Sequence, residues 1–265
     1  STSGAPTGIG TMVWTGAEAI AWGGSDGSTL HGDGASYHPV TNTWTSITIS
    51  GAPTARQGHA AAWTGSEMMI WGGDQGQSSA DYVSSGGRYN PANNTWVSTS
   101  MGPGPSRRVF NTAEWTGSQM LIWGGYEYGL GNSIVFAASG SRYDPALDSW
   151  SPMTTDGTPT PRSAHASVWT GSRMIVWGGT NGITRLASGA RYDPIADAWS
   201  PTSQIGAPSA RSVPSAAWSG SRMIVWGGYD GTARLVSGGR YDPVSDTWAG
   251  MTLTNAPAGR SGAMT

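Results

Sequence analysis

A tryptophan followed by two glycines recurs five times among the 265 residues of this chain, and this repeat restricts the possible folds more than any other feature. The intervals between successive copies are 49, 52, 54 and 49 residues, and the tryptophans are Trp22, Trp71, Trp123, Trp177 and Trp226. One further tryptophan precedes each of them and another follows it, so five units account for all 15 tryptophans. A unit of this length cannot bury its own apolar faces and needs neighbours. The sequence therefore predicts one domain over residues 1–265, built from five similar units of about 50 residues.

Each unit is expected to form four antiparallel strands, as the second unit illustrates. Small residues in His59–Trp63 suit a crowded inner strand, which a Thr-Gly-Ser turn follows. The segment Met68–Trp71 is continuously apolar, which is typical of a strand covered on both faces. Gly87–Tyr89 gives the third strand, and the fourth begins at Trp96 after an Asn-Pro turn. We predict an all-β fold with essentially no helix. The aromatic side chains expected between units are Trp71, Trp123, Trp177, Trp226, Tyr89, Tyr143, Tyr192 and Tyr241.

The order of these motifs resembles the kelch repeat: Arg-x-x-His, an apolar strand, Gly-Gly, Tyr-Asp-Pro and Trp. The resemblance covers essentially the whole chain. It implies a β-propeller of five four-stranded antiparallel blades around a channel, which binds through the mouth that carries the connections after Gly-Gly. Propellers range over roughly 4–8 blades, but kelch propellers commonly have six or seven. The alternative is therefore a fragment of a six- or seven-bladed propeller.

The two ends of the chain depart from the repeat. Thr7 stands where the second unit has Arg56, and Arg260–Thr265 resembles the start of a sixth inner strand. This C-terminal partial strand either supports the first inner strand or leads into a further blade.

Composition excludes several classes of function. A net charge of −2 and a pI of about 6.0 provide no basic surface for a nucleic acid. The absence of cysteine excludes disulfides, thiolate catalysis and cysteine-ligated zinc. It also excludes the Tyr–Cys copper cofactor of kelch-like propellers that resemble galactose oxidase. No apolar run reaches the ~18 residues of a membrane span. No cofactor and no metal are predicted, and the few charges and many Ser, Thr and Gly residues favour a secreted or cell-surface protein of bacterial origin.

No catalytic motif stands out, since the Gly-x-Ser-x-Gly elbow, the phosphate loop and His-Glu-x-x-His are all missing. The first hypothesis is a non-catalytic adhesion or scaffold module that binds a protein or a glycan, alone or inside a larger assembly. The alternative is a secreted carbohydrate-active enzyme, an epimerase or a hydrolase, that acts on an acidic sugar in the channel. It would use arginines for the carboxylate and His59, His165 or Glu114 for proton transfer.

Two sets of arginines recur at fixed places in the units, and the chain has no lysine. The first set lies between units, where it either hydrogen bonds to neighbouring carbonyls or forms a ring of cations for an anionic ligand. Its members are Arg56, Arg108, Arg162, Arg211 and Arg260. The second set precedes the tyrosines and is expected to brace neighbouring blades; it comprises Arg88, Arg142, Arg191 and Arg240.

The connections after Gly-Gly differ most between units, and the third, from Tyr126 to Gly140, is the longest and most aromatic. Aromatic and arginine side chains on such connections are typical of binding hot spots. The predicted binding residues are Tyr126, Tyr128, Phe136, Phe110, Arg108, Arg162, Arg185, Tyr229, Arg234 and His165. The alternative is that the third connection covers the channel as a lid or covers a blade edge. In the first unit, Asp26, His31 and Asp33 either gather a metal ion or belong to a polar loop.

Overall fold

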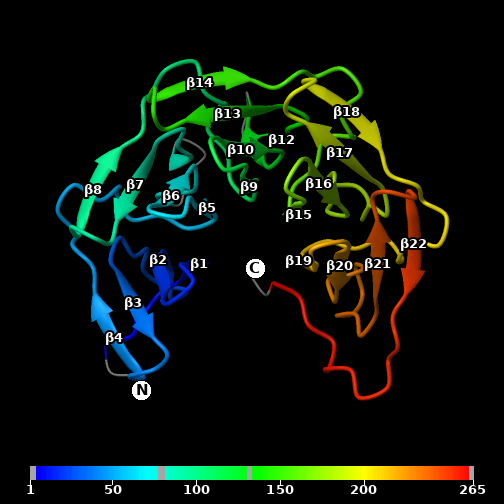
Figure 1. Ribbon diagram of the computed structural model, residues 1–265, viewed down its shortest axis with the longest axis horizontal. Coiled ribbons are helices and arrows are strands. Elements are labelled where there is room, and N and C mark those ends of the chain that lie inside the picture. The colour runs from blue at the N-terminus through cyan, green and yellow to red at the C-terminus, as the bar shows by residue number, and fades with distance from the viewer. Residues whose placement is uncertain (1–3, 77–80, 130–132, 263–265) are drawn as a thin grey trace. The chain divides into compact units, whose positions relative to one another are not determined.

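The computed structural model describes residues 4–76, 81–129 and 133–262, which form five four-stranded antiparallel sheets (Figure 1). We call these sheets blades one to five. Blade one contains β1 (Ile9–Trp14), β2 (Ala19–Ser25), β3 (Gly34–His38) and β4 (Thr43–Ser46). Blade two contains β5 (Ala60–Trp63), β6 (Met68–Trp71), β7 (Gly86–Asn90) and β8 (Thr95–Ser98). Blade three contains β9 (Thr112–Trp115), β10 (Met120–Trp123), β13 (Gly140–Asp144) and β14 (Ser149–Pro152).

Blades four and five repeat this arrangement. Blade four contains β15 (Ala166–Trp169), β16 (Met174–Trp177), β17 (Gly189–Asp193) and β18 (Ala198–Pro201). Blade five contains β19 (Ser215–Trp218), β20 (Met223–Trp226), β21 (Gly238–Asp242) and β22 (Thr247–Gly250). The described ranges contain no helix, and so no helix that could span a membrane. The predicted all-β class and its five four-stranded blades are confirmed.

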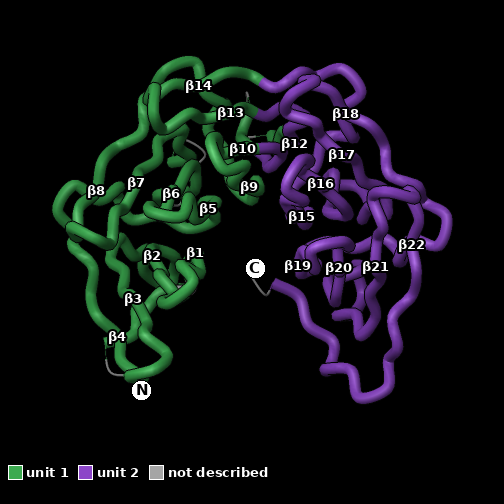
Figure 2. Tube along the Cα trace, in the orientation of Figure 1, with its two compact units in different colours: residues 1–122, 127–135, 141–152 green, residues 123–126, 136–140, 153–265 purple. Residues whose placement is uncertain are grey.

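The chain divides into two compact units (Figure 2). Unit 1 comprises residues 1–122, 127–135 and 141–152, and therefore blades one and two with most of blade three. Unit 2 comprises residues 123–126, 136–140 and 153–265, and therefore blades four and five with the two ends of the third connection.

The second strand of each blade lies between the first and third strands. In blade four, Met174 pairs with Trp169 on one side and Tyr192 on the other, and all four residues of β16 are buried. A continuous apolar run fits this position because both sheet faces are covered. The Gly-Gly pair ends the strand at Gly178 and Gly179, whose φ values of 74° and 94° favour glycine.

Neighbouring blades are joined by stacked aromatic rings. In unit 2, Ile175 and Trp177 of blade four pack against Met223 and Trp248 of blade five, and the two indole centroids lie 5.3 Å apart. The corresponding pairs are Trp22–Trp96 at 5.5 Å, Trp71–Trp150 at 5.6 Å and Trp123–Trp199 at 5.3 Å. The Gly-Gly tryptophan of one blade thus packs on the fourth-strand tryptophan of the next, as expected for blades that cannot bury their own faces.

The tryptophans and tyrosines that were predicted to be largely buried between blades are buried to different degrees. Trp71, Trp123 and Trp177 are fully buried, and Tyr89, Tyr143, Tyr192 and Tyr241 are at most 3% exposed. Trp226 is only half-buried.

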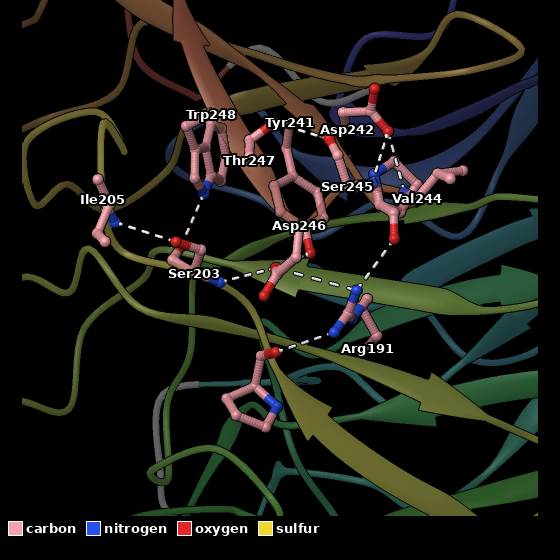
Figure 3. A network of polar contacts seen from close by, with 12 residues as sticks. Arg191, Ser203, Ile205, Tyr241, Asp242, Val244, Ser245, Asp246, Thr247 and Trp248 are labelled. Atoms are coloured by element: carbon pink, nitrogen blue, oxygen red, sulfur yellow. Dashed lines mark hydrogen bonds and ion pairs between the residues drawn. The ribbon is translucent and has the colours of Figure 1, made fainter.

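In blades two to five, the hairpin between the third and fourth strands hydrogen bonds to the link before the blade, as Figure 3 shows for blade five. The carboxylate of Asp246 accepts hydrogen bonds from the Tyr241 hydroxyl at 2.5 Å and from the backbone N–H of Ser203 at 2.9 Å. The indole N–H of Trp248 donates to the Ser203 carbonyl at 2.9 Å. Arg191 of blade four donates to the Pro243 carbonyl at 3.0 Å and lies 3.9 Å from Asp246. In unit 1, Arg88 makes the matching bond to Pro145, so both arginines brace the following blade as predicted.

The third connection forms a hairpin of its own, which the sequence did not predict. β11 (Tyr126–Tyr128) and β12 (Ile134–Phe136) form a separate two-stranded sheet. The residues between these strands that the structure describes include Gly129, whose N–H donates to the Ser133 carbonyl.

Candidate functional site

The arginines that precede the inner strands are buried braces of the backbone. In blade four, Arg162 donates from Nη1 to the carbonyls of Gly178 and Ser188 at 2.9 and 2.7 Å. Its Nη2 donates to the hydroxyls of Thr160 and Ser188, and its Nε to the Thr160 carbonyl. All five N–H donors of the guanidinium are therefore used. Burial lowers the pKa of Arg162 to about 10, so the group stays charged at neutral pH.

Recurrence of this geometry confirms hydrogen bonding to neighbouring carbonyls. Arg56 and Arg211 each bridge the carbonyl of their blade's first glycine and a serine carbonyl in the same way. The exposed fractions are 1% for Arg56, 2% for Arg108, 0% for Arg162 and 1% for Arg211. Two of the predicted binding residues, Arg108 and Arg162, thus lie beneath the surface in the conformation seen here.

The residue three positions after each of these arginines packs against the preceding blade. The His165 ring lies 5.1 Å from the Trp123 ring, edge to face, and a Cβ on Gly124 would lie 2.6 Å from its Cε1 atom. His59 packs on Trp22 in the same way at 5.2 Å, and its Nε2 lies 2.7 Å from the Thr11 hydroxyl. Burial and then the nearby arginine lower the pKa of each histidine to about 3, so both are neutral at physiological pH. Both histidine rings therefore contribute to the packing between neighbouring blades.

Four of the predicted binding residues that reach the surface of unit 2 form one row over three consecutive blades. The rings of Tyr126 and Phe136 lie 5.6 Å apart on the third connection. Phe136 in turn rests on Gly182 in the connection of blade four, where an added Cβ would lie 2.6 Å from its ring. Arg185, at the other end of that short turn, places its guanidinium 5.6 Å from the Tyr229 centroid of blade five. All four side chains are half-buried, and we call Tyr126, Phe136, Gly182, Arg185 and Tyr229 the connection surface.

Tight turns hold the connection surface in place. The Asn181 side chain accepts the N–H groups of Ile183 and Thr184, and the Thr180 hydroxyl donates to the Thr184 carbonyl. In blade five, Asp230 accepts the N–H groups of Thr232 and Ala233. Arg234 is exposed, with its Nε 3.4 Å from the Ser261 hydroxyl. Side chains on such fixed turns lose little conformational entropy on binding.

The remaining predicted binding residues lie in unit 1. Tyr128 packs on Tyr82 with the ring centroids 5.0 Å apart, and Tyr82 is 8% exposed. Phe110 is 50% exposed on the link before β9, and its φ of 53° is unusual for an aromatic residue. Glu127 accepts a hydrogen bond from the Ser106 hydroxyl. Unit 1 therefore carries an aromatic pair of its own, Tyr82 and Tyr128.

The acidic loop of blade one is an ordinary polar turn. Asp26 accepts the N–H groups of Ser28 and Thr29, and His31 lies 3.2 Å from Asp26 and 3.5 Å from Asp33. Hydrogen bonds from Ser28, then Thr29 and His31, lower the pKa of Asp26 well below its usual range. Among the residues that the structure describes, His, Asp and Glu side chains nowhere form a group of three suited to a metal ion. Glu114 is half-buried on β9.

The sequence reasoning missed one residue of the connection surface, Gly182, and the exposed residue beside it, Ile183. Gly182 supports Phe136, and its φ of 89° was foreseeable only from the Asn-Gly pair that precedes a turn. Ile183 is 87% exposed on the same turn. The sequence signal that could have identified Ile183 is an apolar residue directly after Asn-Gly, in a connection that differs between units.

Comparison with protein-family models identifies the repeat independently of this geometry. The model of the attractin/LZTR1 β-propeller matches residues 19–187, and the model of the KLHDC2/KLHL20/DRC7 kelch-repeats domain matches residues 132–265. A comparison with curated proteins returned no match. The two matched regions overlap and together reach from β2 to the C-terminal link, and each spans at least half of the chain. The chain belongs to the kelch-repeat β-propeller family.

Proposed function

We propose that this chain is a non-catalytic binding module that recognises a partner protein through the connection surface of unit 2. The observation that carries the proposal is the continuous row from Tyr126 through Phe136 and Gly182 to Arg185 and Tyr229. Tyrosine and arginine are the residue types most enriched in binding hot spots, and both are held here on tight turns. Kelch propellers are typically protein-binding scaffolds, and the family assignment supports the same conclusion.

The positions of the ionisable residues favour binding over the alternative enzyme. The proposed sugar hydrolase or epimerase needs arginines to hold a carboxylate and a histidine to move a proton. Arg56, Arg108 and Arg162 instead hold backbone segments inside the blades, and His59 and His165 pack against tryptophans with strongly lowered pKa values. Recognition of a partner protein does not require these arginines or histidines to be accessible.

A matched pair of isoleucines in blade four allows a direct test. Ile183, 87% exposed, lies on the connection that enters β17, and Ile195, 95% exposed, lies on the hairpin that leaves it. Each would be replaced by a photo-crosslinking amino acid in the full chain. We expect position 183 to capture one defined protein in cells and position 195 to capture none. Equal capture at both positions would count against the proposal.

Affinity measurements with the captured protein would then test the individual side chains. Phe136→Ala and Arg185→Ala should each weaken binding by ~30-fold, which corresponds to the ~2 kcal/mol of a hot spot. Ile195→Ala is the control, and melting curves of all three variants should coincide with that of the parent. A glycan array would be run in parallel. If the array showed glycan binding and Phe136→Ala abolished it, the ligand of the connection surface would be a carbohydrate and not a protein. The secreted or cell-surface location remains a prediction.

A further inference from the structure

The short connection in blade four holds an asparagine and a glycine in a tight turn. Asn181 and Gly182 form the one Asn-Gly pair in the sequence. They open a four-residue turn, residues 181–184, which the bridge between Thr180 and Arg185 closes. Gly182 is exposed and has a φ of 89°. An asparagine before glycine can lose its side-chain amide, since no Cβ on the glycine hinders attack of the glycine nitrogen on the asparagine Cγ atom.

Hydrogen bonds within the turn polarise the side-chain carbonyl of Asn181. Its Oδ1 atom accepts the backbone N–H groups of Ile183 at 3.0 Å and of Thr184 at 2.9 Å. Attack at Cγ places negative charge on this oxygen. Two N–H donors aimed at the same oxygen are the arrangement that stabilises tetrahedral intermediates in acyl transfer. The turn therefore stabilises the transition state for attack at Cγ more than it stabilises the neutral amide.

A hydroxyl group holds the nitrogen that would attack. The N–H of Gly182 donates to Oγ1 of Thr180 at 3.1 Å, and this hydroxyl donates in turn to the Thr184 carbonyl at 3.0 Å. A hydrogen bond to an acceptor raises the electron density on the donating nitrogen, and bonds in such a chain reinforce one another. One turn thus holds and activates both reacting groups of the Asn-Gly pair.

Two other blades show that an aspartate fits the same turn. Asp26 of blade one and Asp230 of blade five stand at the position of Asn181, and each precedes a glycine with positive φ. Each carboxylate accepts the N–H groups two and three residues later at 2.7–2.8 Å. Hydrogen bonds from Ala233 and then Thr232 lower the pKa of Asp230 to about 2, so the turn favours the ionised acid. An aspartate at position 181 would keep the turn and gain charge-assisted hydrogen bonds.

We propose that Asn181 is a self-modifying site, whose side chain is converted to aspartate in the folded chain without an enzyme. The nitrogen of Gly182 attacks Cγ of Asn181, so that the N–Cγ bond forms and the Cγ–Nδ2 bond breaks. The proton of the Gly182 N–H passes through solvent to the leaving nitrogen, which departs as ammonia. Water then adds to Cγ of the cyclic imide and breaks the new N–Cγ bond. This step restores the peptide N–H and leaves a carboxylate, whose proton goes to solvent.

The same two N–H donors determine which product forms. Opening of the imide at the backbone carbonyl would give isoaspartate, which lengthens the backbone by one carbon atom. The N–H groups of Ile183 and Thr184 polarise the Cγ carbonyl instead, and so direct water to Cγ and favour aspartate. The product adds a negative charge to the turn that carries Arg185. The reaction does not depend on the function proposed for the connection surface, because every group that it needs lies in residues 180–184.

Incubation of the pure folded chain in mildly alkaline buffer tests the proposal. Unfolding and tryptic digestion in mildly acidic buffer then give a peptide of residues 174–185, in which Asn181 is the sole asparagine. Mass spectrometry measures loss of the amide, and chromatography against synthetic standards separates aspartate from isoaspartate. The reference is the same peptide, synthesised and incubated free. We expect the folded chain to convert faster than the free peptide and to give mainly aspartate. Slower conversion in the folded chain, or an excess of isoaspartate, would overturn the inference.

Two matched variants separate the contribution of the hydroxyl from that of the turn. Asp26→Asn creates an Asn-Gly pair in blade one, where the N–H of Gly27 donates to the Ser25 hydroxyl at 3.0 Å. Asp230→Asn creates one in blade five, where Tyr229 directs its hydroxyl to a carbonyl of the turn instead. The first variant should convert at a rate similar to that of position 181. The second should convert about 2–10-fold more slowly, the kinetic equivalent of one hydrogen bond.

Two substitutions in blade four complete the test. Thr180→Val removes the acceptor of the Gly182 N–H and should slow conversion at position 181 by a similar factor. Asn181→Asp reproduces the product and should melt no earlier than the parent. An unchanged rate in Thr180→Val, together with equal rates in blades one and five, would refute activation by the hydroxyl. Earlier melting of Asn181→Asp would refute the fit of the product to the turn.

Discussion

Arg162 shows how a charged residue can serve a purely structural purpose in this molecule. Its five N–H donors bond to Thr160 on the link before blade four and to Gly178 and Ser188 at the two ends of the connection in that blade. The guanidinium needs no carboxylate partner, because these backbone carbonyls and hydroxyls stabilise its charge. A lysine could not reproduce this geometry, since its three donors do not lie in a plane. The absence of lysine from the whole chain is consistent with arginines used in this way.

Replacing Arg162 with methionine should destabilise the chain by about 2–6 kcal/mol, because the carbonyls of Gly178 and Ser188 lose their donors at about 1–3 kcal/mol each. Arg173 of the same blade is the control. Its side chain is 47% exposed and 3.5 Å from Asp193, so Arg173→Met should change stability by less than about 1 kcal/mol. Urea unfolding of both variants measures the difference. Equal effects would show that the buried bonds contribute little.

The two buried histidines should make the chain sensitive to mild acid. Their pKa is about 3 in the folded chain and about 6.5 when unfolded, so the unfolded state binds more protons below pH 6.5. Stability is therefore complete above pH 6.5 and is lost as the pH falls, by up to about 1.4 kcal/mol per pH unit for each histidine. Asparagine occupies the same place in blade three, at position 111. The double variant His59→Asn, His165→Asn should thus flatten the dependence of unfolding free energy on pH between about 6 and 4. An unchanged slope would contradict this assignment.

At the scale of elements, the hairpin between the third and fourth strands holds the link that precedes the blade in place through hydrogen bonds. Asp197 in blade four has a φ of 48°, and its carboxylate accepts the Tyr192 hydroxyl at 2.5 Å and the N–H of Thr154 at 3.0 Å. Asparagine stands at this position in blades one and two, and it accepts the corresponding tyrosine hydroxyl there. One side chain thus sets the turn and fixes the preceding link.

Asp197→Ala should destabilise the chain by about 2–3 kcal/mol, because it removes two hydrogen bonds and leaves a residue poorly suited to positive φ. Asp197→Asn should retain most of the stability, since an amide oxygen can accept both bonds. The comparison requires only the melting temperatures of the two variants and the parent. If the asparagine variant melted as early as the alanine variant, the charge rather than the acceptor would be responsible.

The strands could be predicted because each carries its own local signal, namely small residues, an apolar run or a tryptophan after a turn. The hairpin of β11 and β12 could not, because Tyr126–Phe136 shows no comparable alternation. The candidate site was predicted in part. Tyr126, Phe136 and Arg185 were proposed from their residue types. Recurrence indicated hydrogen bonds from Arg162 to carbonyls, but it left open a ring of cations at the channel mouth, because it does not show whether the side chain is buried.

At the scale of the whole molecule, stability depends on the junctions between blades. In repeat proteins the total is roughly a sum of unit and nearest-neighbour terms. Trp177 is fully buried and Trp226 is partly buried, although their local sequences are nearly identical. Burial of each indole depends on the neighbouring blade, which a repeat read by itself does not reveal.

Trp177→Ala should therefore destabilise the chain by about 3–5 kcal/mol, the usual effect of truncating a fully buried large aromatic side chain. Trp14, on β1, is 55% exposed and serves as the control, with an expected loss below about 1 kcal/mol for Trp14→Ala. Calorimetry of both variants measures the two losses. An unmoved transition for Trp177→Ala would refute the junction as the source of stability.

The buried brace arginines also have a practical consequence. Trypsin cleaves after arginine and lysine, so in this chain it can cut only at arginine. Arg56, Arg108, Arg162 and Arg211 lie at successive junctions and are at most 2% exposed, so cleavage there requires the blade to open first. Exposed arginines such as Arg173 and Arg222 can be cut directly, so the early fragments of a digestion come from those sites. Cleavage after Arg56, Arg108, Arg162 or Arg211 appears only as the corresponding blade opens, and its rate therefore reports the local stability of that blade.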